Sequence, residues 1–359
     1  MIRPDLSSIP AYVPGENLDH AIKISSNEMA TPPLPSVAAA MSTAAAGAHR
    51  YPDMGVHALR RRLAAHLGVP VGQVTTGCGS SALCQQLVQI TSGPGDEVIF
   101  PWRSFEAYPI FAQVVGAKPV MVPGDETGRH DLDAMIAAIT ERTTLIFLCN
   151  PNNPTGATLT QAEFDSFMQR VPAHITVALD EAYYEFNRAA DTPEGTLEIR
   201  RWPNLVALRT FSKAYGLAGA RVGYAFGPAD YIEALDKVGI PFSVSTVAQT
   251  AAIASLDAGE ELLARTEEIV EQRERLATEI GSLPSQGNFL WLPTPEGDPD
   301  YPTRVSEALA SRRILVRAFP DGVRLTVTTK DEVDQVIAAW RELGLGGVNH
   351  LDGADSNDA

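Results

Sequence analysis

Short apolar runs alternate with helical patterns between about residues 50 and 250. β-Branched and aromatic side chains are common in six of these runs, at 97–100, 119–122, 144–148, 175–179, 205–208 and 222–226. A strand that is apolar on both faces is typical of a parallel sheet covered by helices on both sides. Between two runs, Thr160 and Glu163 form the pattern of a capping box that begins a helix. The alternation therefore predicts an α/β fold with crossover helices.

The final third of the chain has a different pattern. Residues 246–280 are rich in helix formers, 287–292 and 323–328 read as strands, and Thr329 with Glu332 predicts a second capping box. This mixture predicts a smaller α+β domain. We expect a large domain at 46–250, a small domain with an N-terminal arm at 1–45 and 251–345, and an acidic, mobile tail at 346–359.

Charge and composition narrow the choice of partners. A formal net charge of −16 argues against nucleic acid, whose nonspecific binding depends on Lys and Arg. No run approaches the roughly 18 apolar residues of a membrane span, and the N-terminus lacks the apolar segment of a signal peptide. Cys78, Cys84 and Cys149 lack CxxC spacing, which fits reduced thiols, and the histidines show no metal-binding pattern. We expect a cytoplasmic protein without a membrane partner or a metal site.

Three polar motifs follow three of the predicted strands. The motif NPNNPTG occupies 150–156, DEAY occupies 180–183, and TFSK occupies 210–213. Taken singly, NPNNPTG is equally typical of a stiff turn, and Asp180 of a helix cap. Ligands of an open α/β sheet bind beyond the carboxyl ends of its strands, so the three motifs together predict one binding site.

The residue types in these motifs suit pyridoxal 5′-phosphate (PLP). The amine of Lys213 can form a Schiff base with the aldehyde of this cofactor. A carboxylate at Asp180 can keep the pyridine nitrogen protonated, through a charge-assisted hydrogen bond of roughly 1.5–3 kcal/mol. The amide of Asn153 and the phenol of Tyr183 can both reach the 3-oxygen of the ring.

A second group of residues is suited to the cofactor's phosphate. The stretch TGCGSSA at 76–82 precedes a helical pattern through Leu83, Leu87 and Ile90. Glycines there let backbone N–H groups approach an anion, and a helix N-terminus favours negative charge. Arg221 would add a guanidinium contact, for which lysine is a poor substitute.

The combination of NPNNPTG, DEAY and SKAYGLAGARVGY resembles the PLP-dependent aminotransferases of fold type I, in the branch that contains histidinol-phosphate aminotransferases. The resemblance runs from about Asn27 to Trp340. It implies a large domain with a mainly parallel seven-stranded sheet, a smaller α+β domain, PLP as cofactor, and a homodimer with active sites at the subunit interface.

The resemblance also implies a role for individual residues. The catalytic set is Lys213, which holds the cofactor and shuttles protons, Asp180 and Tyr183. Phe105 resembles the aromatic residue stacked on the cofactor ring, and Tyr51 the tyrosine that reaches the neighbouring subunit's phosphate. The other cofactor-binding residues are Gly79, Ser80, Ser81, Asn153, Thr210, Ser212 and Arg221. Substrate binding falls to Arg324, which resembles the arginine that grips the carboxylate, with Asn153 and Arg317.

In this reaction the amino acid displaces Lys213 from PLP, and the freed amine removes the α-proton as a general base. Reprotonation and hydrolysis leave pyridoxamine phosphate and a 2-oxo acid. A second 2-oxo acid then reverses the sequence, which is ping-pong kinetics.

The substrate is predicted from departures within the branch. Many histidinol-phosphate enzymes have an acidic residue after the phosphate-loop Gly-Ser, whereas this chain has Ser80-Ser81-Ala82-Leu83. They also separate the two C-terminal arginines by more residues than lie between Arg317 and Arg324. Both departures, with WRSFEAYP at 102–109, resemble phenylalanine aminotransferases. We therefore expect transamination of phenylalanine, tyrosine and tryptophan with a 2-oxo acid such as 2-oxoglutarate.

Several alternatives stay open at this point. Arg317 can hold a substrate phosphate, as a histidinol-phosphate aminotransferase requires, or lie on the surface. A PLP-dependent amino-acid-phosphate decarboxylase and a noncatalytic PLP-binding regulator would use a similar residue set. The residues that can line an apolar side-chain pocket or belong to the ordinary core are Tyr12, Tyr108, Phe242 and Phe319.

Overall fold

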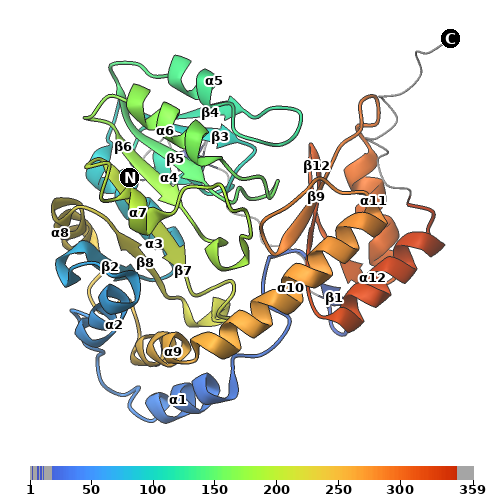
Figure 1. Cartoon of the computed structure of the whole chain (residues 1–359), viewed down its shortest axis with the longest axis horizontal. Coiled ribbons are helices and arrows are strands. Elements are labelled where there is room, and N and C mark those ends of the chain that lie inside the picture. Colours follow the sequence, from blue (N-terminus) through green and yellow to red (C-terminus); the bar gives the residue numbers. More distant parts are fainter. Residues whose placement is uncertain (1, 3–5, 8, 10, 12–17, 346–359) are drawn as a thin grey trace.

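The computed structural model describes residues 2, 6–7, 9, 11 and 18–345. A seven-stranded sheet forms the larger part of the molecule, in the order β2-β8-β7-β6-β5-β3-β4 (Figure 1). Its strands are β2 (Val74–Gly77), β3 (Glu97–Trp102), β4 (Lys118–Pro123), β5 (Thr143–Cys149), β6 (Thr176–Asp180), β7 (Leu205–Thr210) and β8 (Gly223–Phe226). The mainly parallel seven-stranded sheet is confirmed, and all six predicted strands are present.

The strand β8 departs from the parallel pattern, since it runs antiparallel to both β7 and β2. A parallel neighbour needs a crossover connection, usually a helix of a dozen or more residues. The chain between β7 and β8 contains only a short 3₁₀ turn, η4 (Ala218–Ala220), so it reverses direction. This short connection carries Lys213. The apolar run at 222–226 predicted the strand, but neither its direction nor the edge strand β2 beside it.

Helices cover both faces of the sheet. Alternate strand residues point to opposite faces, so Ile146 and its neighbour Phe147 belong to different apolar clusters. One face packs against α3 (Ser80–Thr91), α4 (Tyr108–Val114) and α8 (Ala229–Val238). The other packs against α1 (Pro35–Ala45), α2 (His57–Leu67), α5 (Leu132–Ala137), α6 (Gln161–Arg170), α7 (Gly195–Glu198) and α9 (Thr246–Asp257). The capping box of Thr160 and Glu163 is confirmed at the start of α6.

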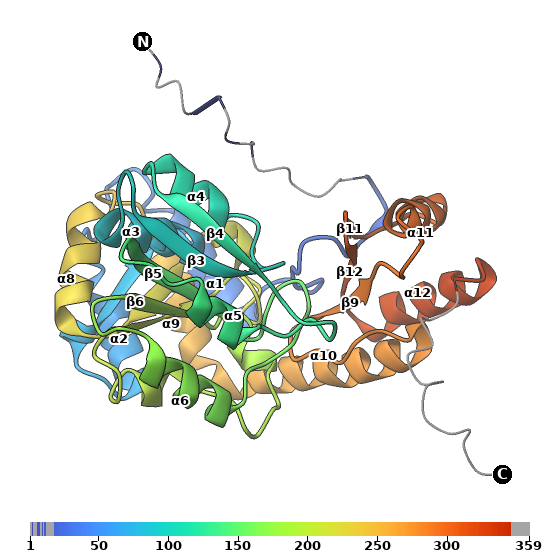
Figure 2. The same ribbon diagram turned by 90° about the horizontal axis from the view of Figure 1, so that it is seen from above.

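A smaller α+β part lies beside the large sheet (Figure 2). It contains an antiparallel sheet of β11 (Arg317–Phe319), β12 (Gly322–Thr326) and β9 (Phe289–Pro293), and a parallel pair of β1 (Ile22–Lys23) and β10 (Ile314–Leu315). Its helices are α10 (Gly259–Ile280), α11 (Tyr301–Ser311) and α12 (Lys330–Glu342), which begins after the cap Thr329. In Figure 1, α10 extends from α9 to this part of the molecule.

The predicted helical stretch at 246–280 is two helices, because the chain leaves the α-helical conformation at Ala258, just before Gly259. The domain boundaries predicted from the sequence stay a prediction, and Tyr12 and the tail at 346–359 lie outside the described residues. Within the described part of the chain, every helix is too short or too polar to cross a membrane.

Candidate active site

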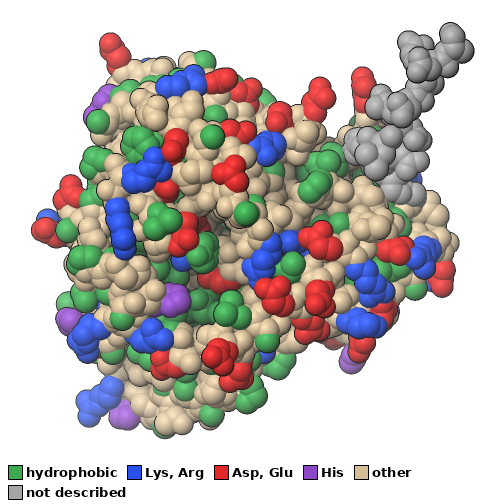
Figure 3. Space-filling view, in the orientation of Figure 1, with side chains coloured by type: hydrophobic (Ala, Val, Ile, Leu, Met, Phe, Trp, Pro, Cys, Tyr) green, Lys and Arg blue, Asp and Glu red, His purple; other side chains and the backbone are tan. Residues whose placement is uncertain are grey.

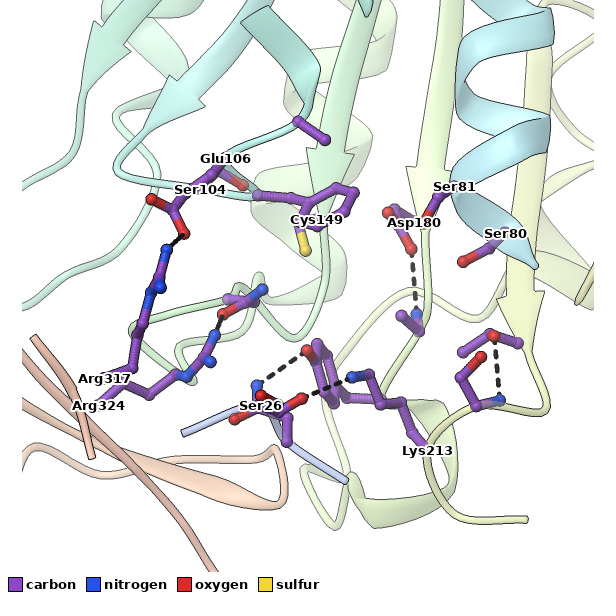
Figure 4. A pocket seen from close by; sticks show the side chains of 18 of the residues that line it. Ser26, Ser80, Ser81, Ser104, Glu106, Cys149, Asp180, Lys213, Arg317 and Arg324 are labelled. Carbon is purple, nitrogen blue, oxygen red and sulfur yellow. Dashed lines mark hydrogen bonds and ion pairs between the residues drawn. The ribbon is translucent and has the colours of Figure 1, made fainter. Parts of the chain in front are cut away.

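A cavity of about 420 Å³ lies at the carboxyl ends of β5, β6 and β7. All three motifs that follow these strands contribute to its walls, through Asn153, Asp180, Tyr183 and Lys213 (Figure 4). The small part of the molecule closes the opposite side with Arg324 of β12. The predicted site residues that line the cavity are Ser80, Ser81, Phe105, Asn153, Asp180, Tyr183, Thr210, Ser212, Lys213, Arg221, Arg317 and Arg324.

The side chain of Lys213 lines this cavity. Its Nζ donates a hydrogen bond to the carbonyl oxygen of Ser26 at 3.2 Å. Burial, together with the positive charge of Arg324, lowers the pKa of Lys213 from its ordinary 10.5 to about 7. A substantial fraction of the amine is therefore uncharged near neutral pH, which is the form that acts as a nucleophile or a base.

The carboxylate of Asp180 is buried in the wall of this cavity. Tyr108 donates its hydroxyl to Asp180 Oδ2 at 2.7 Å, and the N–H of Ala182 donates to Oδ1 at 3.2 Å. Burial raises the pKa of Asp180, while these hydrogen bonds oppose the rise. Tyr108 is fully buried and stacks on Phe147, so it supports Asp180 and does not line the cavity. This role was missed, because only the fold brings Tyr108 to the end of β6.

An anion cradle lies where α3 begins. Gly79 precedes α3 with a φ of 78°, and a Cβ at this position would lie 2.3 Å from Arg221 Nη2. Arg221 Nη1 donates to Ser212 Oγ at 3.1 Å, and the N–H of Ser212 donates to Thr210 Oγ1 at 3.1 Å. A helix N-terminus, hydroxyl groups and a guanidinium thus meet at one point, which is the chemistry that binds phosphate.

Two amide side chains position the remaining polar groups. Arg324 donates from Nη1 to Asn153 Oδ1 and from Nη2 to the carbonyl oxygen of Ser25, both at 2.6 Å. Asn27, which is fully buried, donates from Nδ2 to the hydroxyl of Tyr183 at 3.0 Å. Asn27 was not singled out as a site residue, since it lies far from DEAY along the chain and carries no local motif.

Comparison with known proteins agrees with the chemistry of this site. Residues 19–339 match the family model described as aminotransferase class I and II. The chain belongs to this family. A curated relative from Corynebacterium efficiens, named an aromatic amino acid aminotransferase, is 59% identical over 96% of this chain and 100% of its own length. Another of that name from Corynebacterium diphtheriae is 60% identical over 95% of this chain and 98% of its own.

Solved structures of aminotransferases resemble the present one. The histidinol-phosphate aminotransferase of Sinorhizobium meliloti, in complex with PLP, has a TM-score of 0.86 at 30% identity and covers 95% of this chain and 97% of its own. The family predicted from the three motifs is therefore confirmed. The residues of this aminotransferase also fit PLP, because an amine, a buried carboxylate and an anion cradle surround one cavity.

Apolar and paired charged side chains complete the wall of this aminotransferase cavity. Phe105, Ile110, Phe111 and Phe319 contribute the apolar part. Arg317 Nη2 lies 3.0 Å from Glu106 Oε2, so Arg317 is half of an ion pair and not a solvated surface residue. The sequence did not predict the partner Glu106, although this residue lies within WRSFEAYP at 102–109.

Two of the predicted aromatic residues lie elsewhere in this aminotransferase. The rings of Tyr51 and Phe242 contact each other at an interplanar angle of 30°, with centroids 4.7 Å apart, outside the cavity of their own chain. Phe242 does not line the cavity of its own chain, and it is 40% exposed, so it belongs neither to that cavity nor to the core. The exposed fraction of Tyr51 is 83%, as a residue that contacts another molecule would require.

A second cavity, of about 650 Å³, opens on the other side of the sheet, between residues 187–194 and the start of α10 (Figure 3). Asp180 points into the first cavity, and its neighbour Glu181 points into the second. There Glu181 Oε2 accepts from Arg209 Nε at 2.9 Å, and both side chains are buried. This pair fixes the strand ends of β6 and β7 from behind.

Proposed function

We propose that this aminotransferase transfers the amino group of phenylalanine, tyrosine or tryptophan to a 2-oxo acid such as 2-oxoglutarate. The observation that carries the proposal is the composition of one cavity. Lys213 and Arg324 line it together with Phe105, Phe111 and Phe319, so an amine, a carboxylate-binding cation and aromatic walls meet in one place. The names of the relatives from the two Corynebacterium species support the same substrate class.

Each residue of the site would have a separate role in this reaction. When bound, PLP accepts the amino group and the electrons of the substrate's α-carbon. Lys213 would hold the cofactor through its amine and then move the α-proton, since its low pKa leaves it a usable base. Asp180 would hold the proton on the pyridine nitrogen, and Arg324 would hold the substrate carboxylate by two parallel hydrogen bonds. The cradle of Gly79, Ser80, Ser81, Thr210, Ser212 and Arg221 would hold the phosphate.

We also propose that the enzyme is a homodimer and that Tyr51 reaches the phosphate held by its partner. Tyr51 and Phe242 form an exposed aromatic pair outside their own cavity, with Met54 and Ile240 also exposed. Exposed apolar side chains of this size gather at protein–protein interfaces. A cytoplasmic location stays a prediction of the sequence.

The deciding experiment compares kcat/KM for phenylalanine and for histidinol phosphate, with 2-oxoglutarate as the common acceptor. A preference for phenylalanine supports the proposal, and a preference for histidinol phosphate overturns it. Formation of the 2-oxo acid without release of carbon dioxide separates transamination from decarboxylation. The variant Lys213→Ala serves as the control, and steady-state turnover by this variant would contradict the assigned mechanism.

A further inference from the structure

Glu106 and Arg317 form an ion pair at one end of the cavity, where the small part of the molecule meets the large part. Glu106 lies in the turn between β3 and α4, whereas Arg317 begins β11. Their side chains are 32% and 17% exposed, and both line the cavity. Figure 4 shows the pair beside Arg324, above Ser26 and Lys213. The charge of Glu106 therefore belongs to the substrate site and not to the outer surface.

The two arginines at this end have different partners. Arg317 and Arg324 are direct cross-strand neighbours in β11 and β12. Arg324 donates to two neutral oxygens, Asn153 Oδ1 and the carbonyl of Ser25. Arg317 faces the carboxylate of Glu106 at 3.0 Å, which matches its positive charge with a negative one.

We propose that Glu106 is a specificity-determining residue, because it holds Arg317 in an ion pair and cancels the charge that a phosphate-bearing side chain would need. This proposal rests on the proposed function, and it identifies Glu106 as the residue that disfavours histidinol phosphate, the alternative substrate. A phosphate that approached Arg317 would also meet the like charge of Glu106, which is discrimination by repulsion. An aromatic side chain meets a neutral pair and the ring of Phe319, which lies under Arg317 with the guanidinium carbon 5.5 Å from the ring centroid.

The test uses the cofactor-loaded enzyme with the variant Glu106→Gln. Single-turnover rates are measured for phenylalanine and for histidinol phosphate without any acceptor, so that binding of the second substrate does not contribute. Glutamine keeps the size of the side chain and removes its charge. The ratio of the rate constants, histidinol phosphate over phenylalanine, should rise by roughly tenfold or more, because a charge-assisted contact to the phosphate becomes available.

Two controls isolate the pair. Asp321 lies in the turn between β11 and β12, accepts a hydrogen bond from Arg103 Nε at 2.5 Å, and does not line the cavity. Asp321→Asn therefore removes one negative charge from the hairpin that carries Arg317, and it should leave the ratio of the two rate constants unchanged. In an Arg317→Gln background, Glu106→Gln should raise the ratio much less than in the wild type, because the arginine it releases is gone.

An unchanged ratio in Glu106→Gln overturns the inference, as does an equal rise in the Arg317→Gln background. These results are distinguishable from failure of the proposed function. That failure would show as a preference of the wild-type enzyme for histidinol phosphate, whereas the inference is judged by the change between variant and wild type.

Discussion

The backbone of Gly79 lies against the guanidinium of Arg221, so close that a side chain at this position would displace the guanidinium. A Cβ at Gly79 would lie 2.3 Å from Arg221 Nη2 and 3.0 Å from its guanidinium carbon. Gly79 also has a φ of 78°, which residues with a Cβ adopt reluctantly. The N-terminus of α3 and the arginine after Lys213 are thereby held together as one anion cradle.

Replacing Gly79 by alanine should therefore weaken PLP binding. The added methyl group strains the backbone and displaces Arg221, so we expect the dissociation constant of PLP to rise by roughly tenfold or more. A fluorescence titration of the cofactor-free protein measures it. Gly219→Ala is the matched control, since no atom lies within 4 Å of its Cβ position. Equal effects of the two substitutions would contradict the prediction.

The hydroxyl of Tyr108 should tune the carboxylate of Asp180. The hydrogen bond from Tyr108 lowers the pKa of Asp180, so Tyr108→Phe should raise that pKa and move the loss of kcat at low pH to higher pH. We expect kcat at neutral pH to fall about tenfold, less than the loss of roughly a hundredfold expected for Asp180→Ala. The pH profile of kcat measures the shift.

Tyr224→Phe is the control for Tyr108→Phe, because Tyr224 is also a fully buried tyrosine of the sheet but its hydroxyl lies beside Arg209 and not Asp180. The control should leave the pH profile in place. A profile that is unchanged in Tyr108→Phe, or near-normal kcat in Asp180→Ala, would remove the assignment of Asp180 to the pyridine nitrogen.

Lys213 should destabilise the cofactor-free protein near neutral pH. The pKa of Lys213 is about 7 in the folded state and near the ordinary 10.5 in the unfolded state, so the unfolded chain binds more protons between these values. Stability from this group therefore rises with pH across that window, and the destabilisation is complete below about pH 7. Lys213→Met should be more stable at pH 7, by on the order of a few kcal/mol, with the difference disappearing toward pH 10.5.

Thermal melting of the two cofactor-free proteins from pH 6 to pH 10 measures this difference. A difference in Tm that stays constant across the range would show that Lys213 keeps an ordinary pKa in the folded state.

The buried pair of Glu181 and Arg209 should be a large contributor to stability. Their side chains are 1% and 3% exposed, so Glu181→Gln leaves a buried guanidinium without its counter-charge. We expect a loss of roughly 3–5 kcal/mol in the free energy of unfolding, measured by denaturant titration. The exposed pair of Glu233 and Lys237 provides the control, and Glu233→Gln should leave the free energy of unfolding nearly unchanged. Similar losses of unfolding free energy in Glu181→Gln and Glu233→Gln would contradict the prediction that burial makes the first pair the more important one.

Arg324 should favour substrates that carry a carboxylate over substrates that lack one. Arg324→Lys removes the planar, two-pronged donor, so kcat/KM for phenylalanine should fall roughly a hundredfold. Histidinol phosphate has no carboxylate and should lose less. Arg317→Lys is the matched control on the neighbouring strand, where the loss for phenylalanine should be small. Equal losses for both substrates in Arg324→Lys would refute the role of Arg324.

Much of the fold was predictable because its signals are local. Apolar runs placed six strands of the large sheet, and the capping box at Thr160 placed the start of α6. The direction of β8 and the break between α9 and α10 were not predictable from apolar content. The first depends on the length of a connection, and the second on a change of backbone conformation at one residue, Ala258.

The sequence by itself determined the family and the residues that its motifs name, because Lys213, Asp180 and Asn153 each follow an apolar strand whose end the fold must place at one edge. Only the tertiary structure decided which residues support them. Tyr108 bonds to Asp180 across 72 positions, Asn27 to Tyr183 across 156, and Glu106 to Arg317 across 211. A hydrogen bond over such a separation leaves no periodicity or spacing in the chain, since it exists only after the strands and the two parts of the molecule have packed.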